Sequence, residues 1–424
     1  MTHRSIALCS LAIALVGCKQ QADTPMEIED EAAALRTYTE HIRPLLAEYC
    51  VGCHQAGGAA PFALDNYEDA SNWSSAIASS VRDRRMPPYL ADASGECRTF
   101  KHSQWLSDEQ IESFELWVEG GAEQGDTSIV APEPQLRPKL DGDIRSVDIG
   151  VDYLPDQSQT DDYRCFVVDS PGAMAISGFN VVPGNPSIVH HLIAYQAMDQ
   201  AAADEARQLD ADSEEPGYPC LGTGPQVDAT SVAGWAPGAG AELFPEGIGV
   251  EVDGEMPLII EMHYNVAGGP GQTDRTTLEL QAEPTGSLRP MLELVAIDLD
   301  FVGEPGQRSF VTTDDFPISW QVDFEGTKNL RLLGANPHMH KRGVSQRIER
   351  VGPDGEVECL LEIPRWDFNW QRSYWYDERI EISSEDSLRI TCEFDTMDAT
   401  EPVTWGEGTG DEMCLGSVYA VVEE

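Results

Sequence analysis

Apolar positions follow two different periodicities along the chain. From about 37 to 126 they recur at helical spacing, and Tyr38–Tyr49 and Trp73–Val81 are two candidate helices. A third helix is predicted after a capping signal at Ser107, with a buried stripe formed by Ile111, Phe114, Trp117 and Val118 and with paired glycines at its end. The first part of the chain is therefore predicted to be a small all-helical domain.

After about residue 145 the pattern changes to short apolar runs between turns rich in Gly, Pro and Asp. The clearest runs are Arg164–Val168, Leu258–Tyr264, Leu330–Leu333 and Leu388–Phe394. This texture predicts antiparallel, jelly-roll-like β-sandwiches, and roughly 280 residues exceed one ordinary sandwich, so two are expected. The predicted organisation is a signal peptide (1–17), a flexible tether (18–36), a helical domain (37–126), a linker (127–144) and two sandwiches (145–290 and 291–424).

The N-terminus has the pattern of a bacterial lipoprotein signal. Arg4 supplies the positive charge, and the apolar run Ile6–Val16 is too short to span a bilayer. Leu15-Val16-Gly17-Cys18 then resembles a lipobox, in which Cys18 carries the lipid. The alternative is an ordinary signal peptide that contains a cysteine. The lipoprotein interpretation predicts anchoring in the bacterial cell envelope, facing the periplasm or the exterior.

The charge of the chain limits its partners. The chain has 74 acidic and 27 basic residues, for a formal net charge of −47. Nucleic-acid binding is excluded as a function class, because phosphate needs a basic surface. Direct adsorption to anionic lipid is also disfavoured.

Cys50-Val51-Gly52-Cys53-His54 has the pattern of a covalent haem attachment site. Cys50 and Cys53 would bond to the haem, and His54 would ligate the iron. A disulfide or zinc loop is the alternative. Met86, in Met-Pro-Pro, resembles the ligand methionine of small class I cytochromes c, and His102 is the alternative sixth ligand. One covalent haem c per chain is therefore expected.

The five histidines beyond residue 102 lie in three short motifs, which are His190-His191, His263 and His338-Met339-His340. Residues i and i+2 of a strand face the same side, so His338 and His340 can chelate one metal. Adjacent His190 and His191 need a bulge, a strand end or different ring nitrogens to do so. Imidazole with a thioether suits copper, and zinc is the alternative metal.

The order His-His, His-Tyr, Pro-His-x-His and Glu-Met-Cys resembles the copper type II, ascorbate-dependent monooxygenases, over about 145–424. The family includes peptidylglycine α-hydroxylating and dopamine β-monooxygenases. The resemblance implies two nine-stranded sandwiches with two coppers facing each other across a solvent-filled cleft. It assigns the electron-storing copper to His190, His191 and His263. It assigns the dioxygen-binding, catalytic copper to His338, His340 and Met413.

The cysteines fit an exported protein. Cys9 leaves with the signal, and after lipidation and haem attachment an even number remains: Cys97, Cys165, Cys220, Cys359, Cys392 and Cys414. The family resemblance implies the pairs Cys165–Cys220 and Cys392–Cys414. Cys97 and Cys359 have no assignment from the sequence.

These features together predict an exported, haem- and copper-dependent monooxygenase. It would hydroxylate a C–H bond of an unknown substrate with dioxygen, and its own cytochrome would relay electrons from an external donor. No basic carboxylate-binding motif is evident, so a peptidylglycine substrate does not carry over from the family. The alternatives are a non-catalytic electron-transfer or copper-binding lipoprotein and a structural zinc protein.

Overall fold

The computed structural model describes residues 36–423, apart from 57–59, 61, 136–137, 221–223, 237–238, 267–268, 323–327 and 407–409. The predicted signal peptide, Cys18 and nearly all of the tether lie outside the described residues. Within the described part of the chain, no helix combines the length and the apolar character needed to cross a bilayer.

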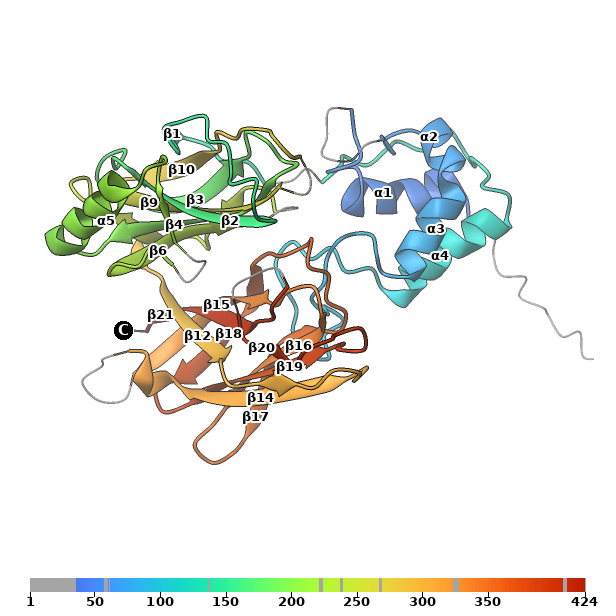
Figure 1. Cartoon of the computed structure of the whole chain (residues 1–424). Helices are drawn as coiled ribbons and strands as arrows, with labels where there is room; N and C mark the ends of the chain where they lie inside the picture. The colour runs from blue at the N-terminus through green and yellow to red at the C-terminus, as the bar shows by residue number, and fades with distance from the viewer. Residues whose placement is uncertain are drawn as a thin grey trace, which may run out of the picture. The chain divides into compact units, whose positions relative to one another are not determined.

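Helices dominate the region before residue 126 (Figure 1), with bounds η1 Tyr38–Ile42, α1 Arg43–Tyr49, α2 Tyr67–Asn72, α3 Ser74–Arg82 and α4 Asp108–Glu119. The three helices predicted from the sequence are confirmed, whereas the short α2 was not predicted. Ser107 and Gln110 form a reciprocal capping box at the start of α4, and Gly120 caps its end. Phe114 and Trp117 are fully buried in the core that the helices share.

The next part of the chain forms two sheets, one ordered β1-β10-β3-β8-β11 with β7 paired to β3, and one ordered β5-β2-β9-β4-β6. Their strands are β1 Asp143–Asp148, β2 Asp161–Val168, β3 Met174–Val182, β4 Val189–Ala197, β5 Tyr218–Pro219, β6 Ala229–Trp235, β7 Glu242–Leu243, β8 Ile248–Val252, β9 Leu258–Asn265, β10 Thr277–Glu283 and β11 Arg289–Pro290. One hydrophobic core contains side chains from both sheets, such as Ile176 and Leu280 from the first and Leu192 and Ile260 from the second.

The last part of the chain forms sheets ordered β12-β21-β15-β18 and β14-β19-β16-β17, with a small pair β13-β20. The strands are β12 Leu292–Asp298, β13 Val302–Gly303, β14 Phe310–Pro317, β15 Asn329–His338, β16 Gly343–Val351, β17 Val357–Ile363, β18 Tyr374–Ser383, β19 Ser387–Phe394, β20 Val403–Thr404 and β21 Cys414–Val422. A 3-10 turn, η3 Ile318–Trp320, follows β14. The two larger sheets contribute to one core, for example through Val418 and Ile390.

The predominantly β character of the second half is confirmed. Among the described strands every pairing is antiparallel except that of β11 with β8, so the all-antiparallel prediction is wrong at that edge. The 13-residue helix α5 Gln200–Asp212 was also not predicted. Its buried face is made of alanines, including Ala202, Ala203 and Ala206. These short side chains give a much weaker apolar stripe than Leu or Ile would.

Residues 89–101 leave the helical core and pack in the last β part of the chain. Tyr89, Leu90 and Phe100 are buried in the core that contains β15 and β19. The backbone N–H of Leu90 donates to the Tyr374 hydroxyl at 3.3 Å, and that of Asp92 donates to the Glu362 carbonyl at 2.9 Å. Sequence periodicity does not reveal this packing, because the segment has neither helical nor strand spacing.

Three disulfides are present among the described residues. Cys165–Cys220 and Cys392–Cys414 are the two pairs expected from the family resemblance, and both are confirmed. Cys97–Cys359 pairs the two cysteines that the sequence left unassigned, and it bonds the 89–101 segment to β17.

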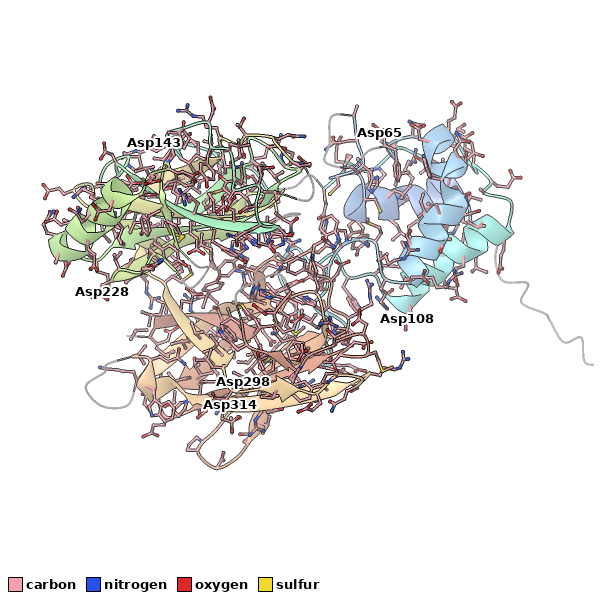
Figure 2. All side chains as sticks on the ribbon, viewed as in Figure 1. Asp65, Asp108, Asp143, Asp228, Asp298 and Asp314 are labelled. Atoms are coloured by element: carbon pink, nitrogen blue, oxygen red, sulfur yellow. A yellow bond between two sulfur atoms is a disulfide. The ribbon has the colours of Figure 1, made fainter. Side chains whose placement is uncertain are left out.

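Acidic side chains lie on every part of the described chain (Figure 2). Asp65 and Asp108 are exposed in the helical part, Asp143 and Asp228 in the first β part, and Asp314 in the last. The negative charge is therefore spread over the surface rather than confined to one tail.

Candidate metal centres

Three neighbouring strands bring the first three histidines together. His263 lies on β9, which is flanked by β2 and β4, and it is directly opposite Tyr163 on one side and His191 on the other. The register of β4 shifts between Val189 and His191. This is the bulge that adjacent histidines need in order to face one metal.

The ring nitrogens of this first cluster are arranged as a ligand set. One ligand atom from each of His190, His191 and His263 lies within 4.8 Å of the others. The Nδ1 atoms of His190 and His191 are 3.3 Å apart. Two nitrogens bound about 2.0–2.1 Å from a tetrahedral ion would be separated by about 3.3 Å. The spacing therefore fits two ligands of one metal.

Asp161 fixes the third ring of the first cluster. Nε2 of His263 lies 3.0 Å from Oδ1 of Asp161, so it donates its proton there and leaves the lone pair on Nδ1. That Nδ1 is buried and has no hydrogen-bond partner among the described residues. A buried nitrogen acceptor is costly without a partner, and a metal ion would supply one.

Burial keeps the histidines of the first cluster neutral. Burial, together with the smaller effect of the neighbouring imidazoles His263, His338 and His340, lowers the pKa of His190 to about 3. Burial also lowers the pKa of His191 and that of His263. Neutral imidazole is the form that binds metal. The cluster is therefore ready to bind metal at neutral pH without first losing protons.

His338 and His340 lie at the end of β15 and just beyond it. In the pairing of β15 with β21, His338 is opposite Leu415. Beyond β15, the backbone N–H of His340 donates to the carboxylate of Glu412, the residue before Met413, and Met413 is only 6% exposed. The two imidazoles are perpendicular, with ring centroids 5.3 Å apart. Folding therefore brings the three predicted ligands of the second cluster into one region.

Both rings of the second cluster are held by their Nδ1 atoms. Nδ1 of His338 lies 2.6 Å from Oε1 of Gln371, and Nδ1 of His340 lies 3.1 Å from the Asp411 carbonyl oxygen. Each Nδ1 therefore donates its proton to an oxygen, and the lone pair is on Nε2. Burial lowers the pKa of His338 to about 4, so this ring is also neutral.

Glu412 anchors the backbone beside the second cluster. Its buried carboxylate accepts the backbone N–H of His340 at 3.0 Å and that of Arg342. Burial raises the pKa of Glu412 to about 7, although these two donors oppose the shift. The residue next to Met413 thereby fixes the position of His340.

A short loop between β17 and β18, residues 366–371, also holds the second cluster and is called the site loop below. Nε1 of Trp366 donates to the His340 carbonyl oxygen at 2.9 Å. Nε2 of Gln371 donates to the Phe368 carbonyl oxygen at 2.9 Å, while its Oε1 contacts His338.

The same loop reaches the first cluster. The Phe368 ring stacks on His190 with centroids 4.7 Å apart, and it lies edge-on to His340 at 6.0 Å. The site loop thus contacts both clusters.

Sequence reasoning did not identify Asp161, Trp366, Phe368 or Gln371 as parts of the site. None of them stands at ligand spacing from a histidine, and the site loop has no periodicity. The Glu-Met-Cys motif contained Glu412, but its role depends on contacts with a distant part of the chain.

The candidate haem motif follows α1. Cys50 is a free thiol, and neither Cys50 nor Cys53 belongs to the three disulfides of the described residues. Nδ1 of His54 lies 3.1 Å from the Phe62 carbonyl oxygen, which leaves Nε2 as the ligand atom. This arrangement suits an axial histidine of a haem. Met86 is 36% exposed, on the loop that follows α3.

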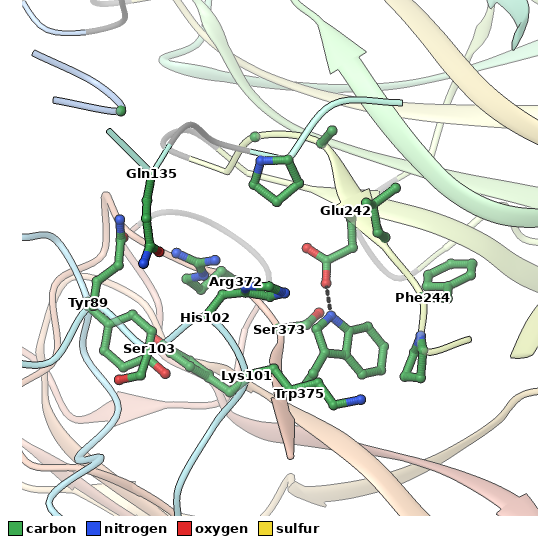
Figure 3. A pocket seen from close by; sticks show the side chains of 18 of the residues that line it. Tyr89, Lys101, His102, Ser103, Gln135, Glu242, Phe244, Arg372, Ser373 and Trp375 are labelled. Atoms are coloured by element: carbon green, nitrogen blue, oxygen red, sulfur yellow. Dashed lines mark hydrogen bonds between the residues drawn. The ribbon is translucent and has the colours of Figure 1, made fainter. Parts of the chain in front are cut away.

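A cavity of about 550 Å³ adjoins both Gly52 of the haem motif and the start of β18. Figure 3 shows Lys101, His102 and Arg372 around it, together with Glu242, whose Oε1 accepts from Nε1 of Trp375 at 2.5 Å. His102, the alternative haem ligand, therefore lines this cavity. Arg372 directly follows Gln371, the partner of His338.

Comparisons with known proteins point to copper enzymes. Residues 313–420 match the family model "Copper type II ascorbate-dependent monooxygenase, C-terminal domain". The chain is 24% identical to dopamine beta-hydroxylase of Canis lupus familiaris over 327 residues, covering 74% of this chain and 51% of the relative. It is 21% identical to tyramine beta-hydroxylase of Caenorhabditis briggsae over 337 residues, covering 75% and 54%. The chain thus spans about half the length of these curated relatives. The matches support a relationship with the copper monooxygenase family.

Among solved structures, the chain matches recombinant N-glycanase F with a TM-score of 0.25 and 8% sequence identity. The match covers 66% of this chain and 96% of the N-glycanase F chain. A similarity this weak carries no inference.

Proposed function

We propose that this protein is a copper-dependent monooxygenase that hydroxylates a substrate C–H bond with dioxygen. The observation that carries the proposal is the pair of imidazole clusters. Ligand atoms of His190, His191 and His263 lie within 4.8 Å of one another, and the ring centroids of His338 and His340 are 5.3 Å apart. The matches to copper monooxygenases support it independently. The match covers only about half the length of these relatives, so the substrate is part of the proposal and stays unnamed.

The two clusters would have different tasks. His190, His191 and His263 would hold one copper with three imidazoles, a set suited to electron storage. His338, His340 and Met413 would hold the other with two imidazoles and a thioether, and the soft sulfur favours Cu(I). Copper, when bound, would supply single electrons and activation of dioxygen. Asp161, Gln371 and the Asp411 carbonyl would keep His263, His338 and His340, respectively, in the tautomer that binds metal.

We propose that the first part of the chain is a class I-like cytochrome c domain. Cys50 and Cys53 would attach one haem covalently, with His54 and Met86 as axial ligands. The hydrogen bond from His54 to the Phe62 carbonyl supports the role of His54. The domain would pass electrons singly from an external donor to the copper sites. The two β parts of the chain, before and after about residue 290, would each be one β-sandwich. In each part, two sheets contribute to one hydrophobic core.

We also propose that Cys18 carries lipid and holds the protein at a membrane of the bacterial cell envelope. The acidic residues after Cys18 would act as a tether. Mass spectrometry of the mature N-terminus tests this, because a lipid-modified cysteine is expected there. An unmodified N-terminus at another position would rule it out.

Copper stoichiometry and X-ray absorption of the reduced protein test the central proposal. Two coppers per chain and one sulfur scatterer are expected, and Met413→His should remove the sulfur signal and lower turnover while copper stays bound. Dioxygen uptake should depend on both clusters. Copper binding without dioxygen uptake would favour the non-catalytic electron-transfer alternative, and zinc in both sites after copper-replete expression would exclude copper chemistry.

The haem proposal has a separate test. Acid–acetone extraction should leave the haem on the protein, and Met86→Ala should abolish the methionine-to-iron charge-transfer band. Haem that extracts freely would contradict covalent attachment. A charge-transfer band retained in Met86→Ala would exclude Met86 as the axial ligand of the haem iron, and His102 would then be tested in its place.

A further inference from the structure

The Phe368 ring contacts a histidine of each cluster. The ring is 4.7 Å from His190 at an interplanar angle of 26°, and 6.0 Å from His340 at 81°. The first contact is stacked and the second is edge-on, and both are favourable geometries for aromatic pairs. His190 belongs to β4, whereas His340 follows β15. The contact therefore joins the two β parts of the chain.

Phe368 belongs to the site loop, which also holds the second cluster. Trp366 holds the His340 carbonyl, and Gln371 holds Nδ1 of His338. Nε2 of Gln371 in turn donates a hydrogen bond to the Phe368 carbonyl oxygen. The side chain that stacks on His190 and the groups that orient His338 and His340 therefore lie in one short segment.

We propose that Phe368 is a positioning residue that couples metal binding at the two clusters. Metal at the first cluster fixes the orientation of the His190 ring, and the fixed ring orders Phe368 and the site loop. The second cluster then binds its metal without bearing the full entropic cost of ordering that loop. The coupling is reciprocal, so metal at the second cluster raises the affinity of the first by the same factor. This inference rests on the proposed copper function.

The expected coupling is about 2- to 10-fold in affinity, the size that an aromatic pair contributes. Cu(I) affinity is measured on the full chain by competition with a chromophoric Cu(I) chelator. Second-cluster affinity is compared between the wild type and His263→Ala, in which the first cluster is disabled. Second-cluster affinity should be about 2- to 10-fold higher in the wild type than in His263→Ala. When both proteins also carry Phe368→Ala, the ratio of the two affinities should be about 1.

Two further variants separate coupling from general damage to the fold. Phe368→Tyr keeps the ring and should retain the coupling. Phe316→Ala removes a half-buried phenylalanine from the same β part of the chain and should also leave the ratio unchanged. If His263→Ala fails to fold, first-cluster affinity in the wild type and in His338→Ala gives the same coupling factor by reciprocity.

The outcomes distinguish the two proposals. A wild-type chain that binds no Cu(I) at either cluster contradicts the proposed function itself. Two filled sites whose affinities do not depend on each other overturn the coupling alone. Coupling that persists unchanged in Phe368→Ala shows that another contact carries it, and this also overturns the role of Phe368.

Discussion

The carboxylate of Asp161 determines which nitrogen of His263 is available. Its Oδ1 lies 3.0 Å from Nε2 and also accepts from the Asn265 side chain at 3.0 Å. Asp161→Asn keeps the shape but removes the charge that makes the imidazole a stronger ligand. First-cluster Cu(I) affinity should fall about 10- to 100-fold. Chelator competition checks this, with Asp143→Asn, an exposed site, as the control; equal affinity in both variants would contradict the role of Asp161.

Gly343 leaves room for Trp366 beside His340. A Cβ at position 343 would lie 2.6 Å from Cδ1 of Trp366 and 2.9 Å from Cε of Met339. Gly343→Ala should therefore displace the indole that donates to the His340 carbonyl, and overpacking of this kind costs about 1–3 kcal/mol. Urea unfolding measures the loss of stability. Gly355→Ala is no matched control, because Gly355 has a positive φ.

Gly234→Ala is a suitable comparison, since nothing lies within 4 Å of a Cβ built there. Second-cluster Cu(I) affinity should fall in Gly343→Ala and stay unchanged in Gly234→Ala. Unchanged stability and affinity in Gly343→Ala would mean that Trp366 and Met339 move aside without cost.

At the scale of elements, the 89–101 segment is tied to β17 by Cys97–Cys359, which spans 262 residues of sequence. Closing so long a loop restricts the unfolded chain strongly. The double variant Cys97→Ser/Cys359→Ser should lower the free energy of unfolding by about 2–5 kcal/mol. Guanidinium unfolding under oxidising conditions measures this while the other two disulfides stay intact. A change below about 0.5 kcal/mol, within the scatter for neutral surface substitutions, would show that packing alone holds the segment.

The elements that the sequence predicted are those with a strong local signal. Helix α4 has a capping box and an apolar stripe, β9 is a buried run of mainly apolar residues, and β19 alternates polar and apolar residues. Helix α5 was not predicted, because its buried face is made of alanines. The packing of the 89–101 segment was not predicted, because its partners are more than 250 residues away in sequence. Histidine clustering identified the candidate ligands, whereas Phe368 and Gln371 come from an aperiodic loop whose position only tertiary packing determines.

At the scale of the whole molecule, Glu242 joins the two β parts through its hydrogen bond with Trp375 at 2.5 Å (Figure 3). Burial raises the pKa of Glu242 to about 7, although Arg372 opposes the shift. Because the folded state favours the neutral carboxyl, the stability that this group contributes is fully present below its ordinary pKa of 4.5. It is lost as the pH rises from 4.5 to about 7.

Glu242→Gln keeps a hydrogen-bond acceptor for Trp375 and removes the titration. The variant should match the wild type near pH 4.5 and exceed it in stability above pH 7. The side chain is partly exposed, so the expected gain is about 1–2 kcal/mol, below the full value of the shift. Urea unfolding at pH 4.5, 6 and 8 measures the difference, and Glu246→Gln, exposed on the same cavity wall, is the control. A difference that does not vary with pH would show that Glu242 stays ionised in the folded protein.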